Sequence, residues 1–364
     1  MLSRKLAVVD PACSNVLLLR CLADSGIDLV LYCDNVLVGQ SIDSRVRVCS
    51  LSSEVGALDE DVSCVLELLQ DQDKRARFYS GDRIRNSAVP LLSLGMSLEE
   101  RSALRESVSD DVLSRLVSVH LPTFFQPVPV FECILCDDNA SSCSRVLSEF
   151  QADKLRFLTY SEGEKPLFDQ MGYFWAVNCI SAALEYGLDV EVADHIVTND
   201  NTGVPLPGVF SILDQMGLDC FVSSLERLVV CLEKNDPMLE LRQKLPEVIY
   251  GMISDGLTGI NGRGGFYRTY HMRYGAMDQV IDLRSGLYRG LKKDMFLHES
   301  LLDKKCEAFS NAIWSRFLAY AEYISGLYGA TIISRVDDIL RIGYGWKYGV
   351  CEVASRLGMQ CSLE

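Results

Sequence analysis

The sequence lacks a long apolar run, and this absence argues against a membrane-spanning protein. Among its 364 residues no uninterrupted apolar stretch reaches the about 18 residues that a membrane-spanning helix needs. The longest candidate, residues 173–184, is expected to be a core helix. No apolar block of signal-peptide length precedes Asp10, so we expect no export. These absences predict a cytoplasmic protein that does not contact a membrane.

Positive charge is also scarce in this chain. It has 35 Lys and Arg residues against 50 Asp and Glu residues, which gives a net charge of −15. A surface with this balance repels phosphate backbones. We therefore expect no nucleic-acid partner.

Paired cysteine spacing is missing too, although the chain has 14 cysteines. The one Cys-x-x-Cys sequence, Cys133–Cys136, falls in a predicted strand, where positions three apart face opposite sides of a sheet. No second pair with metal-ligand spacing accompanies it. We expect no metal site, and without an export signal we expect reduced, mostly buried thiols.

The sequence has the composition of a globular protein, with 48% apolar and 23% charged residues. Its first 160 residues alternate short apolar runs with helical periods. This alternation predicts an α/β fold with a right-handed, mostly parallel, doubly wound sheet. The predicted strands are 5–9, 29–33, 46–49, 64–66, 89–94, 116–121, 128–136 and 155–160.

Long helical periods replace this pattern from about Pro166, which predicts an all-α part. A two-strand hairpin is expected between Met277 and Arg289, because Ser285-Gly286 supplies a turn. Helices resume from Leu301. The chain is thus divided into an α/β domain at residues 1–165, a helical domain at 166–275, a hairpin and linker at 276–304, and a second helical repeat at 305–364.

A weak internal repeat supports this division. The segment Gly208–Leu218 lines up with Gly349–Met359. A similar short segment precedes each copy, and it contains Asp194 before the first and Asp337 before the second. A chance match is the alternative. The preferred interpretation is a duplicated helical unit in which each copy buries its apolar face on the other.

Several motifs resemble the 3-hydroxyacyl-CoA dehydrogenase family over nearly the whole chain and in the right order. They are Gly203-Val204-Pro205 with Phe210, Asp214 and Gly217-Leu218-Asp219, then Gly259–Tyr267, then 338–352, and in the N-terminal part 123–130. The resemblance implies a Rossmann-like NAD-binding domain at 1–165 and two helical C-terminal units. It also implies NAD as cofactor, and NAD-dependent oxidation of 3-hydroxyacyl-CoA to 3-oxoacyl-CoA in fatty-acid β-oxidation.

The family's catalytic positions carry other residues in this chain. Its histidine base corresponds to Thr123, and the carboxylate that orients this base corresponds to Leu135. The family's asparagine corresponds to Gln170, which keeps an amide, and its serine to Ser97 or Ser102. A hydroxyl cannot replace a base that titrates near neutrality. The catalytic site is therefore expected to be degenerate.

Two other features have plain structural interpretations. His120 could substitute for the missing base, but an offset of three from Thr123 places it on the opposite face of a strand, so a histidine at a strand edge is expected. The glycine-rich stretch Gly262–Gly265 follows a helix, so it is expected to be a turn that closes the helical domain.

The dinucleotide-binding turn is also changed. The family's glycine-rich turn lets backbone amides approach the pyrophosphate, whereas Asp10–Asn15 contains no glycine. Ser14 and Asp34 are the remaining candidates for contacts with NAD, and Asp34 follows Cys33, which stands at the ribose-binding position. The segment between Asp34 and Cys64 is too short for the family's helical cover over acyl-CoA, so the implied acyl-CoA substrate is poorly accommodated.

Two functions follow from these observations. One is a 3-hydroxyacyl-CoA dehydrogenase with weak or no activity. The alternative is a non-catalytic descendant that serves as a binding module or interacts with a protein partner. Because two helical copies in one chain satisfy each other, a monomer is expected rather than a dimer.

Overall fold

The computed structural model describes most of the chain as two compact units. The described residues are 5–13, 15–24, 26–34, 36, 40, 46–50, 58, 61–124, 129–136, 143, 147, 156–161, 166–198, 200–272, 275–292 and 299–363. The first unit comprises residues 1–122 and 126–166, and the second comprises 123–125 and 167–364.

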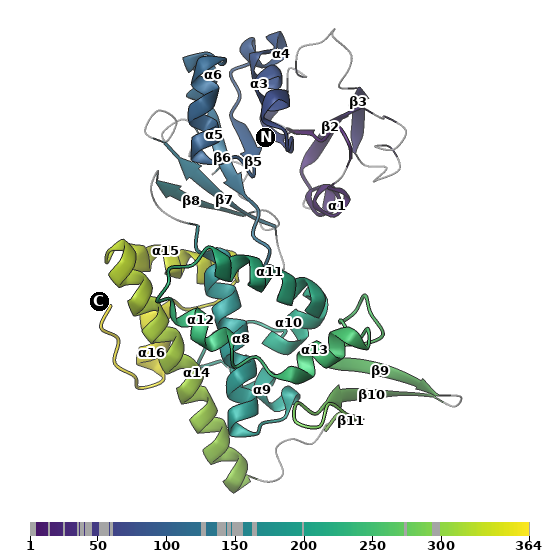
Figure 1. The fold of residues 1–364 in the computed structure, drawn as a ribbon, viewed down its shortest axis with the longest axis vertical. Helices are drawn as coiled ribbons and strands as arrows, with labels where there is room; N and C mark the ends of the chain where they lie inside the picture. The colour runs from purple at the N-terminus through teal and green to yellow at the C-terminus, as the bar shows by residue number, and fades with distance from the viewer. Residues whose placement is uncertain are drawn as a thin grey trace. The chain divides into compact units, whose positions relative to one another are not determined.

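The first unit is built on an eight-stranded sheet, and all eight predicted strands are present in it (Figure 1). The strand order is β3-β2-β1-β4-β5-β6-β7-β8. All neighbours are parallel except β6 and β7, which pair antiparallel. The strands are β1 Lys5–Val9, β2 Asp28–Cys33, β3 Arg47–Ser50, β4 Val62–Glu67, β5 Leu91–Leu94, β6 Leu116–His120, β7 Val130–Leu135 and β8 Arg156–Ser161.

Helices and apolar side chains cover both faces of this sheet, as the continuous apolar runs of its strands require. Leu6 and Val8 of β1 belong to one core cluster, whereas Ala7 and Val9 belong to a second. The order reverses at β1, whose neighbours are β2 and β4, so the carboxyl ends of β1 and β4 form the switch point where doubly wound sheets bind ligands. The helices are α1 Val16–Asp24, α3 Gln72–Ser80, α4 Asp82–Arg85, α5 Leu98–Ala103, η1 Leu104–Glu106 and α6 Asp110–Leu113.

The second unit is helical and is organised around α8, Phe168–Tyr186. Fifteen of the 19 residues in α8 are buried, so the helix needs partners on all sides. The other elements are α9 Val190–Val197, α10 Val209–Met216, α11 Leu218–Val230, α12 Pro237–Arg242, α13 Glu247–Ser254, α14 Glu299–Tyr328, α15 Ile332–Asp338, η2 Ile339–Gly343 and α16 Val350–Arg356.

An aromatic cluster joins the early and late parts of this helical unit. The ring of Trp175 on α8 lies 4.8 Å from that of Trp314 on α14 and 5.0 Å from that of Trp346. Large aromatic side chains bury more area than any other residues and so contribute strongly to the stability of a core. Residues 305–364 therefore share a core with α8.

A small antiparallel sheet completes the unit and extends beyond the two predicted strands. It contains β9 Tyr267–Met272, β10 Gly275–Ile281 and β11 Tyr288–Gly290, in the order β11-β10-β9 (Figure 1). The predicted hairpin corresponds to β10 and β11. The sequence analysis missed β9, because its residues YRTYHM show no apolar alternation.

The two copies of the internal repeat have the same local structure. Asp194 Oδ1 accepts the backbone N–H of Phe210 at 2.8 Å, and Asp337 Oδ1 accepts that of Val350 at 2.8 Å. A Cβ atom on Gly208 would lie 2.3 Å from Asp194, and one on Gly349 would lie 2.2 Å from Asp337. In both copies an aspartate caps the next helix and requires glycine beside it, which supports a duplication.

One expectation about cysteines is wrong. Cys351 and Cys361 form a disulfide that links α16 to the tail after it, so these two thiols are not reduced. The two cysteines lie ten residues apart in the sequence, so no short paired spacing marks them. Most of the other cysteines are buried, as expected. Within the described ranges, no helix is long and apolar enough to span a membrane, and no group of three or more potential ligands could hold a metal ion.

Candidate functional site

A histidine and a glutamate meet at the carboxyl end of β6 in the first unit. The antiparallel register of β6 and β7 places His120 opposite Glu132, so both side chains face the same side of the sheet. His120 Nε2 lies 3.9 Å from Glu132 Oε2. The side chain of His120 is 45% exposed, whereas that of Glu132 is fully buried. A half-exposed imidazole backed by a buried carboxylate is an arrangement used for proton transfer.

Tyr160 of β8 holds the other oxygen of this glutamate. Its buried hydroxyl donates to Glu132 Oε1 at 2.6 Å. The three side chains come from β6, β7 and β8, which are neighbours in the sheet. Tyr160 therefore holds one oxygen of Glu132, and the other oxygen lies 3.9 Å from His120 Nε2.

The sequence analysis missed this pair, although a signal was present. His120 and Glu132 are twelve residues apart, the same spacing that separates Thr123 from Leu135. Relative to Thr123 and Leu135, the positions aligned with the family's histidine and carboxylate, this pair thus lies three residues nearer the N-terminus. The expectation of a histidine at a strand edge rests on the offset of three between His120 and Thr123, and it does not include the partner that the register of β6 and β7 supplies.

Thr123 itself belongs to the second unit, where the carboxylate of Asp169 holds it. Its hydroxyl donates to Asp169 Oδ2 at 2.8 Å and lies 3.1 Å from the hydroxyl of Tyr173. Asp169 also accepts the backbone N–H groups of Thr123 and Phe124, at 3.0 and 2.7 Å. Burial raises the pKa of Tyr173 to about 12, so its hydroxyl stays protonated at neutral pH. Asp169 therefore fixes this segment to α8.

Leu135 and Gln170 are likewise committed to packing. Leu135 is 9% exposed and belongs to the core cluster on the face of β7 opposite to Glu132. Gln170 is buried in α8, where its Nε2 donates to Asp236 Oδ2 at 3.0 Å and to the Tyr320 hydroxyl at 2.8 Å. Burial raises the pKa of Asp236. The amide of Gln170 thus points into the helical core, where Asp236 and Tyr320 accept its hydrogen bonds.

The two candidate serines differ in their surroundings. Ser97 caps α5, where its hydroxyl accepts the backbone N–H of Glu100 at 3.1 Å and its own N–H donates to Glu100 Oε2 at 2.8 Å. Ser102 is exposed on the same helix. The capping box satisfies the start of α5, so Ser97 has a structural role.

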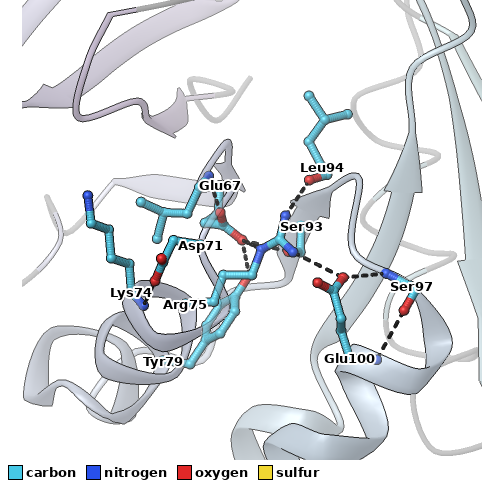
Figure 2. A network of polar contacts seen from close by, with 10 residues as sticks. Glu67, Asp71, Lys74, Arg75, Tyr79, Ser93, Leu94, Ser97 and Glu100 are labelled. Atoms are coloured by element: carbon cyan, nitrogen blue, oxygen red, sulfur yellow. Dashed lines mark hydrogen bonds and ion pairs between the residues drawn. The ribbon is translucent and has the colours of Figure 1, made fainter.

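A second polar cluster lies at the carboxyl ends of β4 and β5 (Figure 2). The carboxylate of Glu67 is buried and accepts from Arg75 Nε at 3.3 Å, from the Tyr79 hydroxyl at 2.9 Å and from Ser93 Oγ at 2.5 Å. Burial raises the pKa of Glu67, and the bond from Ser93 opposes this shift. Arg75 also donates to the carbonyl of Leu94 at 2.7 Å. This cluster fastens α3 to the edge of the sheet where a ligand would bind.

Asp10 occupies the turn between β1 and α1, where the family binds its dinucleotide. Asp10 is 2% exposed, and its Oδ2 accepts the backbone N–H of Asn15 at 2.9 Å. Its backbone N–H donates to the carbonyl of Tyr32 at 3.1 Å. Among the described residues, Cys13 in this turn is the one non-glycine residue with positive φ, at 52°. The turn therefore offers a carboxylate where a pyrophosphate needs N–H donors, and these residues do not fit NAD.

The other two candidates for cofactor contacts add little. Ser14 lies outside the described residues. Asp34 is exposed at the end of β2, and its backbone N–H donates to the carbonyl of Pro11 at 3.0 Å. Asp34 is thus next to the turn that Asp10 fills.

Comparisons with known proteins give relatives of one kind. No family model matches the chain. It is 25% identical to a Rickettsia felis protein named for a fatty acid oxidation complex trifunctional enzyme, over 82% of this chain and 43% of the relative. It is 23% identical to a Bacillus subtilis protein named for a 3-hydroxyacyl-CoA dehydrogenase, over 83% of this chain and 39% of the relative. The chain therefore spans less than half the length of these relatives.

A solved structure shares the fold. The crystal structure of 3-hydroxybutyryl-CoA dehydrogenase from Escherichia coli K12 superposes with a TM-score of 0.54 at 11% identity. The match covers 98% of this chain and 92% of that chain. The α/β sheet followed by helices is thus the architecture of a known dehydrogenase.

Proposed function

Since this chain is related in sequence and in fold to the 3-hydroxyacyl-CoA dehydrogenases, we propose that it descends from an enzyme that oxidised 3-hydroxyacyl-CoA with NAD and that it has little or no such activity itself. Without this redox step, its role is that of a binding module or of a module that interacts with a protein partner. The observation that carries the proposal is the carboxylate of Asp10 in the dinucleotide turn.

The charge of Asp10 opposes a pyrophosphate directly. Two unit charges about 4 Å apart repel each other by about 4 kcal/mol at an effective dielectric constant of about 20. This energy corresponds to a loss of about three powers of ten in affinity. In addition, the backbone N–H of Asn15, at the start of α1, already has Asp10 as its acceptor.

A second candidate function rests on the pair of His120 and Glu132. Its geometry supports proton transfer at a hydroxyl or ketone group, the chemistry that the family needs at the substrate's third carbon. Nε2 of His120 faces Glu132, so Nδ1 is the nitrogen that would take the hydroxyl proton. The carboxylate of Glu132 then stabilises the imidazolium. General acid–base catalysis of this kind contributes about 10²–10⁴-fold.

Oxidation of NADH by acetoacetyl-CoA at high protein concentration, followed by absorbance, tests both candidates. We expect no turnover above background from protein that circular dichroism shows to be folded. Turnover that is lost in His120→Ala and kept in His271→Ala, a change at an exposed histidine of β9, would contradict the first candidate and support the second. Turnover that survives His120→Ala would contradict both.

A further inference from the structure

A cavity of about 630 Å³ lies in the second unit, and none of the residues discussed as catalytic lines it. Its walls come from α10, from the glycine-rich turn before β9, and from β9 and β10. Its lining includes the charged residues Arg263, Arg268, Asp214 and Asp278 and the apolar residues Ile260 and Leu291. This volume is sufficient for a small organic molecule.

Arg268 on β9 is held rigidly in the wall of this cavity. Its Nε donates to Gln279 Oε1 at 2.8 Å, and its guanidinium carbon lies 3.5 Å from the centre of the Tyr288 ring. In the part of the chain that the structure describes, its guanidinium has no other hydrogen-bond acceptor. The two terminal nitrogens are therefore available, and stacking on Tyr288 has already restricted their orientation.

A stacked guanidinium of this kind suits an oxyanion. The aromatic ring covers one face of the plane and leaves its edge open, where two parallel N–H donors match the two oxygens of a carboxylate or phosphate. Preorganisation reduces the entropy that is lost on binding. Arg268 thus provides the chemistry for bidentate recognition.

The surrounding charges do not cancel this cation. Arg263 adds a second guanidinium, which donates to the backbone carbonyl of Asp255. Asp278 carries a negative charge, and its Oδ1 already accepts the hydroxyl of Thr269 at 3.0 Å. Asp214 accepts two backbone N–H groups, and burial raises its pKa to about 7, so it is only partly charged at neutral pH. The wall is therefore neutral to slightly positive.

Apolar side chains occupy the remaining rim. Ile260 is 69% exposed, although it is a large aliphatic residue, and Leu291 is half-buried beside the cavity. We propose that the cavity binds a small organic oxyanion, with the carboxylate or phosphate group on Arg268 and a short apolar chain against Ile260 and Leu291. This site is independent of the proposed function, because the dinucleotide turn and the pair of His120 and Glu132 belong to the first unit.

Isothermal titration of the full chain with hexanoate, hexanol and inorganic phosphate tests this site. We expect hexanoate to bind and hexanol, its neutral counterpart, not to bind. Arg268→Gln should weaken hexanoate at least tenfold, whereas Arg284→Gln, a change at an exposed arginine in the turn before β11, should leave it unchanged. Binding of phosphate that depends equally on Arg268 would support the oxyanion site and assign its ligand to the phosphate class.

Substitution of Arg268 also removes its contacts on β9, so a second variant tests the site while Arg268 is kept. Ile260→Asp changes an exposed side chain at the rim, so the fold should persist, and its negative charge should weaken hexanoate at least tenfold. The proposal is wrong if folded Arg268→Gln and Ile260→Asp bind the probes as the unaltered chain does. Failure of both anions to bind at millimolar concentration would also refute it.

Discussion

His120 and Glu132 meet because β6 and β7 run antiparallel, so residues opposite each other share one face of the sheet. Glu132 is fully buried, which makes its hydrogen bonds important for stability as well as for any chemistry at His120. Tyr160 donates to it at 2.6 Å. At the scale of single residues, removal of this hydrogen bond therefore tests directly how the glutamate is held.

Replacement of Tyr160 by phenylalanine should lower the free energy of unfolding by about 1–3 kcal/mol, because a buried acceptor loses its donor. The measurement is urea unfolding followed by circular dichroism, which reports on both units. Tyr270→Phe is the matched control, because Tyr270 is 50% exposed. Equal effects of the two substitutions would show that the hydrogen bond to Glu132 does not stabilise the fold.

The residue scale is also where prediction from sequence was weakest. The alignment placed the family's base on Thr123 and its carboxylate on Leu135, and both positions follow from the motif around them. The twelve-residue spacing of His120 and Glu132 was the one signal in the sequence, and the strand register that sets the two side chains opposite each other became visible only in the structure. Asp10, in contrast, was predictable, because the sequence itself shows a carboxylate in a turn without glycine. The structure adds that this carboxylate accepts the backbone N–H of Asn15.

At the scale of elements, two aspartates fasten the helices of the second unit. Asp194 caps α10 and also accepts the hydroxyl of Tyr267 at 2.9 Å, while Asp214 at the end of α10 accepts the backbone N–H groups that begin β9. Gly265 leaves room for Asp214, because a Cβ atom there would lie 2.0 Å from its carboxylate. The glycine-rich turn is thus structural, as its position after a helix had predicted.

Adding a methyl group to Gly208 or Gly349 should displace the capping aspartate beside it. We expect Gly208→Ala to lower the free energy of unfolding by at least about 2 kcal/mol, because two backbone N–H groups lose their acceptor. Gly251→Ala on α13 is the control: a Cβ atom there meets nothing within 4 Å, and alanine should stabilise the helix by about 1 kcal/mol. Similar unfolding midpoints for the two variants would argue against the capping role of Asp194.

The same aspartates predict a dependence of stability on pH. Burial raises the pKa of Asp194 to about 6 and that of Asp214 to about 7, from 3.8. Between pH 3.8 and these raised values, the folded protein therefore binds more protons than the unfolded chain. The stability that the two protonated aspartates contribute is lost as the pH rises through 6 to 7.

Tryptophan fluorescence measures this effect selectively, because Trp175, Trp314 and Trp346 all lie in the second unit. The urea midpoint should be lower at about pH 8 than at about pH 5.5, and Asp214→Asn should reduce the difference. An unfolding midpoint that rises with pH over this interval would contradict the assignment.

Strand and helix types were largely predictable at this scale. Apolar runs identified all eight strands of the large sheet. The runs are continuous in the central strands, which are buried on both faces, whereas β3 at the edge of the sheet is only partly buried. β9 was not predicted, because its side chains are polar and partly exposed and so show no alternation with a period of two. The disulfide between Cys351 and Cys361 was not predicted, because it depends on how the tail folds back on α16.

At the scale of the whole molecule, the chain keeps the architecture of the 3-hydroxyacyl-CoA dehydrogenases, and we propose that it has lost most or all of their activity. The late helices share a core with α8 through the three tryptophans, so the second copy of the repeat is covered within the same chain. This packing supports the proposal that the protein is a monomer. A dimer in light scattering would contradict that proposal.

Fluorescence titration of the folded chain with NADH measures the central claim most directly, since it reports binding without any requirement for turnover. We predict no saturable binding to the unaltered chain, and a gain in affinity of about three powers of ten in Asp10→Gly relative to Asp34→Gly, which removes an exposed carboxylate near the same turn. Saturable micromolar binding of NADH to the unaltered chain would contradict the claim that Asp10 closes the dinucleotide site.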